Sequence, residues 1–235
     1  MTGVQTCALP ISAGGGPPCE TFTVARQYDG GPRPLRSAAH PLGIPGLSIR
    51  EWNQLRISDR LLRFLLDVLV ALAMMGLSGF LEHPQFPTWC TRGSPASIWA
   101  TEALIQLKNL GCFSVVSFDQ CTVGALGKKP TTLLLLRLPS VRDTLLRRGC
   151  SGRCNHPPGA HVALIGRELD GTFHTAKAKV YPYGLNKILG EALFQAATQW
   201  EDLDVVHSLP EDFTPYLEQS CHDAAVVQPD YHGGS

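Results

Sequence analysis

The chain has 235 residues, of which 44% are hydrophobic and 17% charged, and its 20 basic residues balance its 20 acidic residues. This profile is typical of one globular domain, with or without tails. The longest uncharged apolar run, residues 68–81, is about 14 residues, whereas a membrane-spanning helix needs roughly 20. Eight cysteines without a secretory signal peptide or even spacing exclude the disulfide framework of a small secreted domain. We therefore expect no membrane partner and an intracellular location, cytoplasmic or nuclear.

The net charge of zero hides an asymmetry along the chain. Residues 201–235 contain eight acidic residues and no Lys or Arg, so residues 1–200 have 20 basic against 12 acidic residues, a net charge of +8. We expect the acidic segment to be a disordered tail. A basic stretch from Lys128 to Arg153 with a single acid, Asp143, favours an anionic partner such as nucleic acid. A solvated helix face is the alternative explanation.

The first fifty residues have no regular periodicity. Residues 1–12, MTGVQTCALPIS, resemble translated sequencing-adapter read-through, so we leave them out of the fold prediction and expect the natural protein to extend further upstream. Residues 13–50 are rich in Gly and Pro, and we expect a long loop region there, which contains the Pro-Pro-Cys motif at residues 17–19. Loops of that length in a compact domain are usually functional or disordered.

Residues 51–200 alternate helical and strand patterns, which predicts an α/β domain with a layered sheet and flanking helices. Ser48, with Glu51 three residues later, forms a capping-box pattern at the start of a long apolar helix that Gly76 and Gly79 end. The four leucines in TTLLLLRL make that strand apolar on both faces, so we expect a central position in a covered sheet. The expected strands are residues 79–81, 113–121 and 131–138, and the other expected helices are residues 97–110, 140–149 and 184–200.

Polar motifs follow several of these expected elements, where open α/β sheets place their functional residues. The motifs are PPC in the Gly/Pro-rich region, EHP at residues 82–84 and DQCxxG from residue 119. In this order they resemble the cytosine-C5 DNA methyltransferase family. They are also similar to uncharacterised protist proteins that share PPCET, HPLG, EHP, DQCxxG, KPT and HxxxxHxxLxG elements. The family resemblance implies a partial Rossmann-like methyltransferase fold whose N-terminal strands are missing from this chain.

The resemblance also implies roles for individual residues. Cys19 would attack C6 of cytosine, and Glu82 would hold the N3 edge of the base and favour its protonated form. The base would have to leave the stack and enter a pocket. Residues expected to contact the nucleic acid are Thr23, Gln120, Lys128, Lys129, Arg147 and Arg148.

The family's methyl donor is S-adenosylmethionine, whose glycine-rich binding loop should precede the Pro-Pro-Cys motif. Only the adapter-like stretch precedes it here, so we expect a truncated or inactive fragment of a methyltransferase-like protein. The alternative is a non-catalytic, zinc-stabilised nucleic-acid-binding module in which Cys19 is incidental. A protein-interaction scaffold is a third hypothesis, which an absence of DNA binding at low salt would favour.

A second group of chemically active residues lies in CSGRCNHPPGAH, residues 150–161. Cys154, His156 and His161, with Cys150, supply the four N and S ligands that tetrahedral zinc prefers. Cys121, from the DQC motif, is an alternative fourth ligand that would tie the loop to the sheet. We expect such a zinc ion to be structural, because four protein ligands leave no open position for water. A turn-rich polar loop with solvated histidines is the other explanation.

Overall fold

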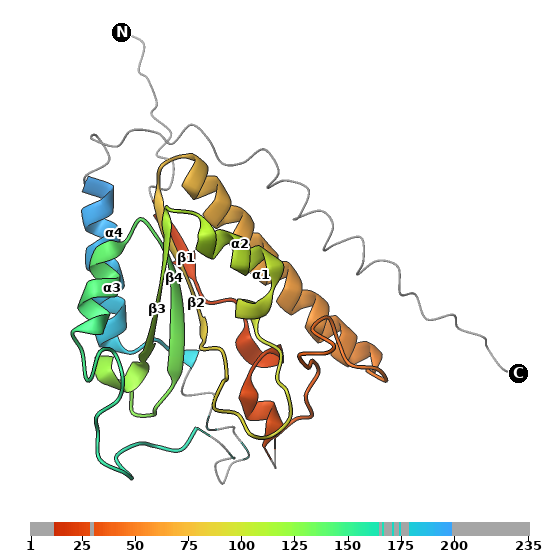
Figure 1. Ribbon diagram of the computed structural model, residues 1–235. Coiled ribbons are helices and arrows are strands. Elements are labelled where there is room, and N and C mark those ends of the chain that lie inside the picture. The colour runs from red at the N-terminus through yellow and green to blue at the C-terminus, as the bar shows by residue number, and fades with distance from the viewer. Residues whose placement is uncertain are drawn as a thin grey trace, which may run out of the picture.

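The computed structural model describes residues 12–28, 31–164, 166, 171, 174 and 179–198. The expectations for the adapter-like segment up to residue 11 and for the acidic tail from residue 201 lie outside these residues. Within them, the chain forms a mixed four-stranded sheet flanked by helices (Figure 1). The α/β class and the layered sheet predicted from the sequence are therefore confirmed.

The sheet has the strand order β1-β2-β4-β3. The strands are β1 (Ser12–Gly15), β2 (Ser78–Pro84), β3 (Phe113–Asp119) and β4 (Pro130–Leu136). β1 pairs in parallel with β2, whereas β4 runs antiparallel to both of its neighbours. The connection from β1 to β2 contains the long helix α1 (Ile49–Met74), so these three elements form a βαβ unit.

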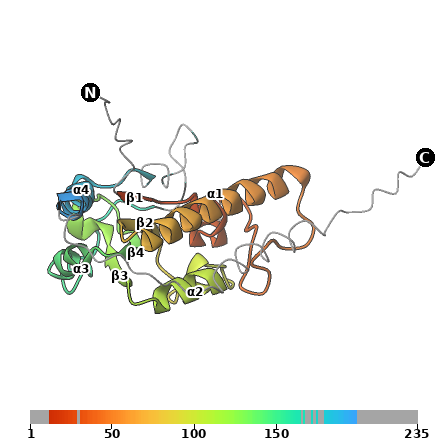
Figure 2. The same ribbon diagram turned by 90° about the horizontal axis from the view of Figure 1, so that it is seen from above.

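Helices cover both faces of the sheet, as Figures 1 and 2 show. Helices α1 and α2 (Glu102–Asn109) pack on one face, and α3 (Pro139–Leu146) and α4 (Tyr183–Thr198) pack on the other. The predicted central strand is confirmed as β4, which lies between β2 and β3. Its Leu134 and Leu136 enter the core beneath α1 and α2, while Leu133 and Leu135 enter the core beneath α3 and α4.

Four elements differ from the sequence predictions. The predicted strand 113–121 ends at Asp119, because Gln120 and Cys121 belong to the 3₁₀ helix η4 (Gln120–Val123). Residues 13–15, predicted as loop, belong to β1, where a Cβ atom on Gly14 would overlap the Phe80 ring of the neighbouring strand. The predicted helix 97–110 is divided into a short 3₁₀ helix, η3 (Ile98–Ala100), and α2, because Thr101 between them has extended backbone. The predicted strand 79–81 extends to residues 78–84, so Glu82 and His83 lie within β2.

None of the described helices combines the length and the hydrophobicity needed to cross a bilayer.

The capping box at the start of α1 is confirmed. The Ser48 hydroxyl accepts a hydrogen bond from the Glu51 backbone N–H at 3.3 Å, and the Glu51 carboxylate accepts one from the Ser48 backbone N–H at 2.8 Å. Arg33 also pairs with Glu51 at 2.7 Å. These hydrogen bonds, with that of Arg33 first, hold the pKa of the Glu51 carboxyl well below its usual range.

We predict that Ser48→Ala lowers the free energy of unfolding by about 1 kcal/mol, because it leaves an N-terminal amide of α1 without its acceptor. Urea denaturation followed by circular dichroism measures the change. Asn53→Ala, at an exposed position of the same helix, is the control and should change stability by less than about 0.5 kcal/mol. Equal effects of the two substitutions would contradict a capping role for Ser48.

Candidate functional site at one edge of the sheet

The strand directions bring four separate motifs to one edge of the sheet. β1 and β2 are parallel neighbours, so the Pro-Pro-Cys loop after β1 and the EHP residues ending β2 lie at the same edge. β4 is antiparallel to β2, and its first residues pair with the end of β2, Thr131 opposite Pro84. The end of β3 also lies here, since Asp119 pairs with Pro130. This functional edge therefore combines residues that are far apart in the sequence.

A cavity of about 830 Å³ opens at the functional edge. The Pro-Pro-Cys loop forms one wall, and the ends of β2 and β4 form another. Cys19 and Glu82, the two residues for which the sequence predicts catalytic roles, both line it. The cavity is also lined by Thr23, Trp89, Lys128, Lys129, Lys179 and Tyr181. The cavity thus contains a thiol, a carboxylate and several cationic groups.

Cys19 is the first residue of the short 3₁₀ helix η1 (Cys19–Thr21) and is partly buried. Burial raises the pKa of its thiol, and the nearby positive charge of Lys129 opposes that rise. The negative charges of Glu82 and Glu20 raise the pKa further. Because the thiolate is the nucleophilic form, Lys129 and a backbone hydrogen bond to the thiol both favour the reactivity of Cys19.

Glu82 is buried, with 5% of its surface exposed, and is held from three directions. Its Oε1 atom accepts hydrogen bonds from Gln120 Nε2 and Lys129 Nζ, both at 3.3 Å. Its Oε2 atom accepts one from the Tyr181 hydroxyl at 3.3 Å. Burial, followed by the charge of Glu82, raises the pKa of Tyr181, which keeps the phenol protonated as a donor. The carboxylate is therefore fixed at the cavity wall.

The next residue, His83, does not line the cavity. It is 1% exposed, and its ring packs edge-on against Phe22 and Trp99. Burial lowers the pKa of His83 to about 3, so the imidazole is neutral at ordinary pH. Within the EHP motif, Glu82 therefore faces the cavity and His83 belongs to the core.

The residues predicted to contact nucleic acid fall in three places. Thr23, Lys128 and Lys129 line the cavity. Gln120 is 1% exposed and lies behind Glu82, so it holds the carboxylate and does not line the cavity. Two further residues, Arg147 and Arg148, are exposed at the end of α3 and are not among the cavity-lining residues.

The contact between Tyr181 and Glu82 is not predicted by any motif in the sequence. Tyr181 lies 99 residues after Glu82 and just ahead of α4, and it carries no motif that would mark it. Lys179, from the same segment, lies next to the Pro-Pro-Cys loop, with its ammonium 2.5 Å from Glu20 Oε1. The packing of α4 against the sheet brings this segment to the cavity, and no local sequence signal encodes that packing.

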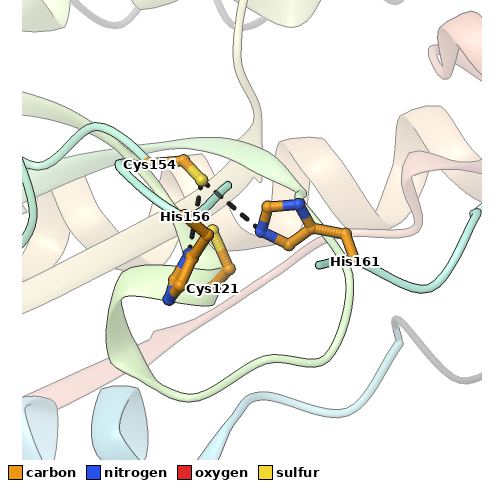
Figure 3. A group of neighbouring side chains, drawn as sticks. All are labelled: Cys121, Cys154, His156 and His161. Atoms are coloured by element: carbon orange, nitrogen blue, oxygen red, sulfur yellow. Dashed lines mark hydrogen bonds between the residues drawn. The ribbon is translucent and has the colours of Figure 1, made fainter. Parts of the chain in front are cut away.

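Figure 3 shows a Cys/His cluster at the same edge, formed by Cys121 after β3 and by three residues of the loop 150–161. The ligand atoms of Cys121, Cys154, His156 and His161 all lie within 4.8 Å of one another. Cys154 Sγ is 3.3 Å from His156 Nδ1 and 3.4 Å from His161 Nε2. Ligands bound tetrahedrally at zinc–ligand distances of about 2.0–2.3 Å lie roughly 3.3–3.8 Å apart. This cluster can therefore hold a metal ion after small side-chain movements.

Of the two alternatives for the fourth ligand, the cluster contains Cys121 and not Cys150. Cys150 is exposed, and its backbone pairs with that of Arg153 in a tight turn. Cys121 comes from the 3₁₀ helix η4 (Gln120–Val123) after β3 and is buried. Burial, followed by the neighbouring Cys154, raises the pKa of the Cys121 thiol to about 11. A metal would have to displace that proton on binding.

Hydrogen bonds from both the backbone and the side chain of Asp119 attach the Cys/His loop to the end of β3. The Asp119 N–H donates to the Gly152 carbonyl at 2.9 Å, and Asp119 Oδ2 accepts from the Cys154 N–H at 2.8 Å. Lys128 lies 3.8 Å from the same carboxylate oxygen. Arg153 also donates to the Gln85 side chain at 2.6 Å. The cluster is thus connected to residues next to the cavity.

No protein-family model, no curated protein and no solved structure matches this chain. The fold and the functional edge therefore define it at the level of class, as an α/β protein with a thiol-containing cavity beside a Cys/His cluster that could hold a metal.

Proposed function

We propose that the chain is the nucleophile-bearing half of a protein like the cytosine-C5 DNA methyltransferases, and that its cavity takes an unstacked cytosine base. One observation carries the proposal. Cys19 and Glu82 are 63 residues apart in the sequence, yet they line one cavity at the ends of two adjacent parallel strands. A thiol and a carboxylate in one pocket are the two groups that addition to cytosine requires.

The proposed chemistry begins with the thiolate of Cys19. Its sulfur forms a bond to C6 of the ring, the C5–C6 π bond breaks, and the displaced electron pair makes C5 nucleophilic. Glu82 acts at N3, where protonation removes the charge that the addition creates. Lys129 favours the thiolate, and Gln120 and Tyr181 hold Glu82 in place. Cys19 and Glu82 are the catalytic residues of this proposal.

The described residues do not fit the methyl donor. S-adenosylmethionine would supply the methyl group to C5 when bound, and its glycine-rich loop should connect a strand to a helix N-terminus. Here the glycines at 14–16 lead from β1 into Pro17 and Pro18 and then a three-residue 3₁₀ helix. The proposal is therefore limited to binding of the base and addition of the Cys19 sulfur to it, which need only residues of this chain.

The addition step can be tested without a donor. While sulfur is bonded to C6, C5 takes a proton from water; loss of the original C5 hydrogen and expulsion of the thiolate then restore cytosine. The full chain should therefore release tritium from oligonucleotides labelled at C5 of cytosine faster than buffer alone does. Single-stranded and duplex oligonucleotides should both be assayed, because a single-stranded base costs less to unstack. Release at the buffer rate from both would refute the proposal.

A second candidate function is the non-catalytic nucleic-acid-binding module. It is favoured by a smaller cavity of about 640 Å³ beside the Cys/His cluster, which Lys128, Arg153 and Trp89 line. Cations can contact phosphates there, and an indole can stack on a base. Both candidates predict salt-dependent oligonucleotide binding, so tritium release separates them. Binding without release would favour the module.

For the Cys/His cluster we propose zinc as the metal, in a structural role. Two thiolates and two imidazoles are a donor set that zinc prefers, and the four side chains fill a tetrahedral shell. The purified chain should contain roughly one equivalent of zinc after expression in zinc-supplemented medium. A content below about a tenth of an equivalent would refute the assignment.

A further inference from the structure

Three consecutive residues at the end of β3 connect the Cys/His cluster to the Cys19–Glu82 cavity. Asp119 accepts a hydrogen bond from the backbone of Cys154. Gln120 donates a hydrogen bond to Glu82. Cys121 belongs to the Cys/His cluster. Each residue of this tripeptide therefore contacts a different part of the functional edge.

The side chain and backbone of Gln120 are both fixed on the cavity side. Its Nε2 atom donates to Thr131 Oγ1 at 3.1 Å as well as to Glu82. Its backbone N–H donates to the Lys129 carbonyl at 3.0 Å. A displacement of Gln120 would therefore alter both the carboxylate and the lysine that face Cys19. Because Gln120 is almost completely buried, it has little room to move independently of Cys121.

We infer that a metal ion in the Cys/His cluster fixes the position of Gln120. Gln120 is then the positioning residue through which the bound metal sets the geometry of the Cys19–Glu82 cavity. The inference rests on the proposed metal site and not on the proposed base chemistry. Four ligand bonds join the turn after β3 to the loop of residues 150–161, so the turn moves less when the metal is present. Gln120, next to a ligand in the sequence, transmits that restraint to Glu82 and Lys129.

The pKa of the Cys19 thiol can be used to detect this restraint, because it depends on the positions of the charged neighbours of the thiol. Lys129 stabilises the thiolate, whereas Glu82 and Glu20 oppose it. Lys179 and Tyr181 also face the thiol. Loss of the metal should let Gln120 and Lys129 move away, which removes the charge that favours the thiolate. The pH midpoint of Cys19 alkylation should then rise.

The test measures iodoacetamide modification of Cys19 against pH by mass spectrometry, in zinc-loaded and chelator-treated full chain under reducing conditions. In the wild type, zinc removal should raise the midpoint by roughly half a pH unit or more. Gln120→Met keeps the length of the side chain but removes its amide. Its midpoint should already be raised with zinc bound, and zinc removal should add little, since coupled changes are not additive.

Cys112 supplies an internal control, because it directly precedes β3 at the opposite edge of the sheet. Its modification should not depend on zinc. An unchanged midpoint for Cys19 in the wild type, or an equal zinc-dependent shift in Gln120→Met, would overturn the inference. A parallel change at Cys112 would also overturn it, since zinc would then act on the whole fold. If the chain binds no zinc, the metal site and this inference fail together, while the base chemistry is still tested separately by tritium release.

Discussion

Replacement of Cys19 by serine is expected to reduce tritium release from C5 of cytosine by at least about 10³-fold. A serine hydroxyl is far less acidic than a thiol and is a weak nucleophile without an adjacent base. Among the described residues, the titratable groups that interact with the Cys19 thiol are Lys129, Glu82, Glu20, Lys179 and Tyr181. None of them is a neutral imidazole that could take the serine proton.

The matched control for Cys19→Ser is Cys112→Ser. Cys112 is also a partly buried free cysteine, but it does not line the cavity. Its replacement should leave tritium release within about two-fold of the wild type. Oligonucleotide binding by Cys19→Ser should be unchanged, because the cationic groups at the cavity are intact. If Cys19→Ser keeps more than a tenth of the wild-type release rate, the thiol is not the nucleophile.

Replacement of Cys154 by serine is expected to lower the part of the free energy of unfolding that depends on zinc by about 3–4 kcal/mol. This holds when the free zinc concentration is roughly 100 to 1,000 times the Kd of the wild-type site. Cys154 lies near the centre of the cluster, with both imidazoles within 3.4 Å of its sulfur. A serine oxygen is a poor replacement for a thiolate ligand. Guanidinium denaturation with and without a chelator measures the difference.

Cys150→Ser is the control for this prediction, because Cys150 was the alternative ligand and lies outside the cluster. It should keep its zinc and its zinc-dependent stability. A loss of zinc in Cys150→Ser with retention in Cys121→Ser would show that the ligand assignment is wrong. Zinc affinity should also fall as the pH is lowered, about ten-fold per pH unit for each thiol that must lose a proton. Because the pKa of Cys121 is raised, its thiol is protonated at neutral pH, so zinc affinity should depend on pH in the neutral range and above it.

The sequence predicts the parts of the fold that local chemistry determines. The Ser48–Glu51 capping box marks the start of α1, and the four leucines of β4 identify the strand that is covered on both faces. β1 was not predicted, because its glycines have low strand propensity and only pairing with β2 makes them a strand. The break between η3 and α2 depends on the extended backbone of Thr101, which helical periodicity does not reveal.

The candidate site shows the same division between local and long-range information. Cys19 and Glu82 could be singled out because each stands in a short motif after an expected strand or in a proline-rich loop. The Cys/His loop could be identified from its donor residues, but the choice between Cys121 and Cys150 depended on how the loop folds back onto β3. Tyr181 and the role of Gln120 behind Glu82 could not be predicted, since both depend on packing between distant segments.

The antiparallel direction of β4 has a consequence for how this site can change over evolution. The short connection between β3 and β4, residues 120–129, places its lysines beside the carboxyl ends of β1 and β2 and leaves the leucines of β4 in the core. Substitutions at the exposed positions of this connection, such as Leu126 and Lys128, are tolerated far better than changes at its buried residues Gln120 and Cys121 or in the core. The charge presented to a substrate can therefore diverge between related chains while the sheet that supports it stays the same.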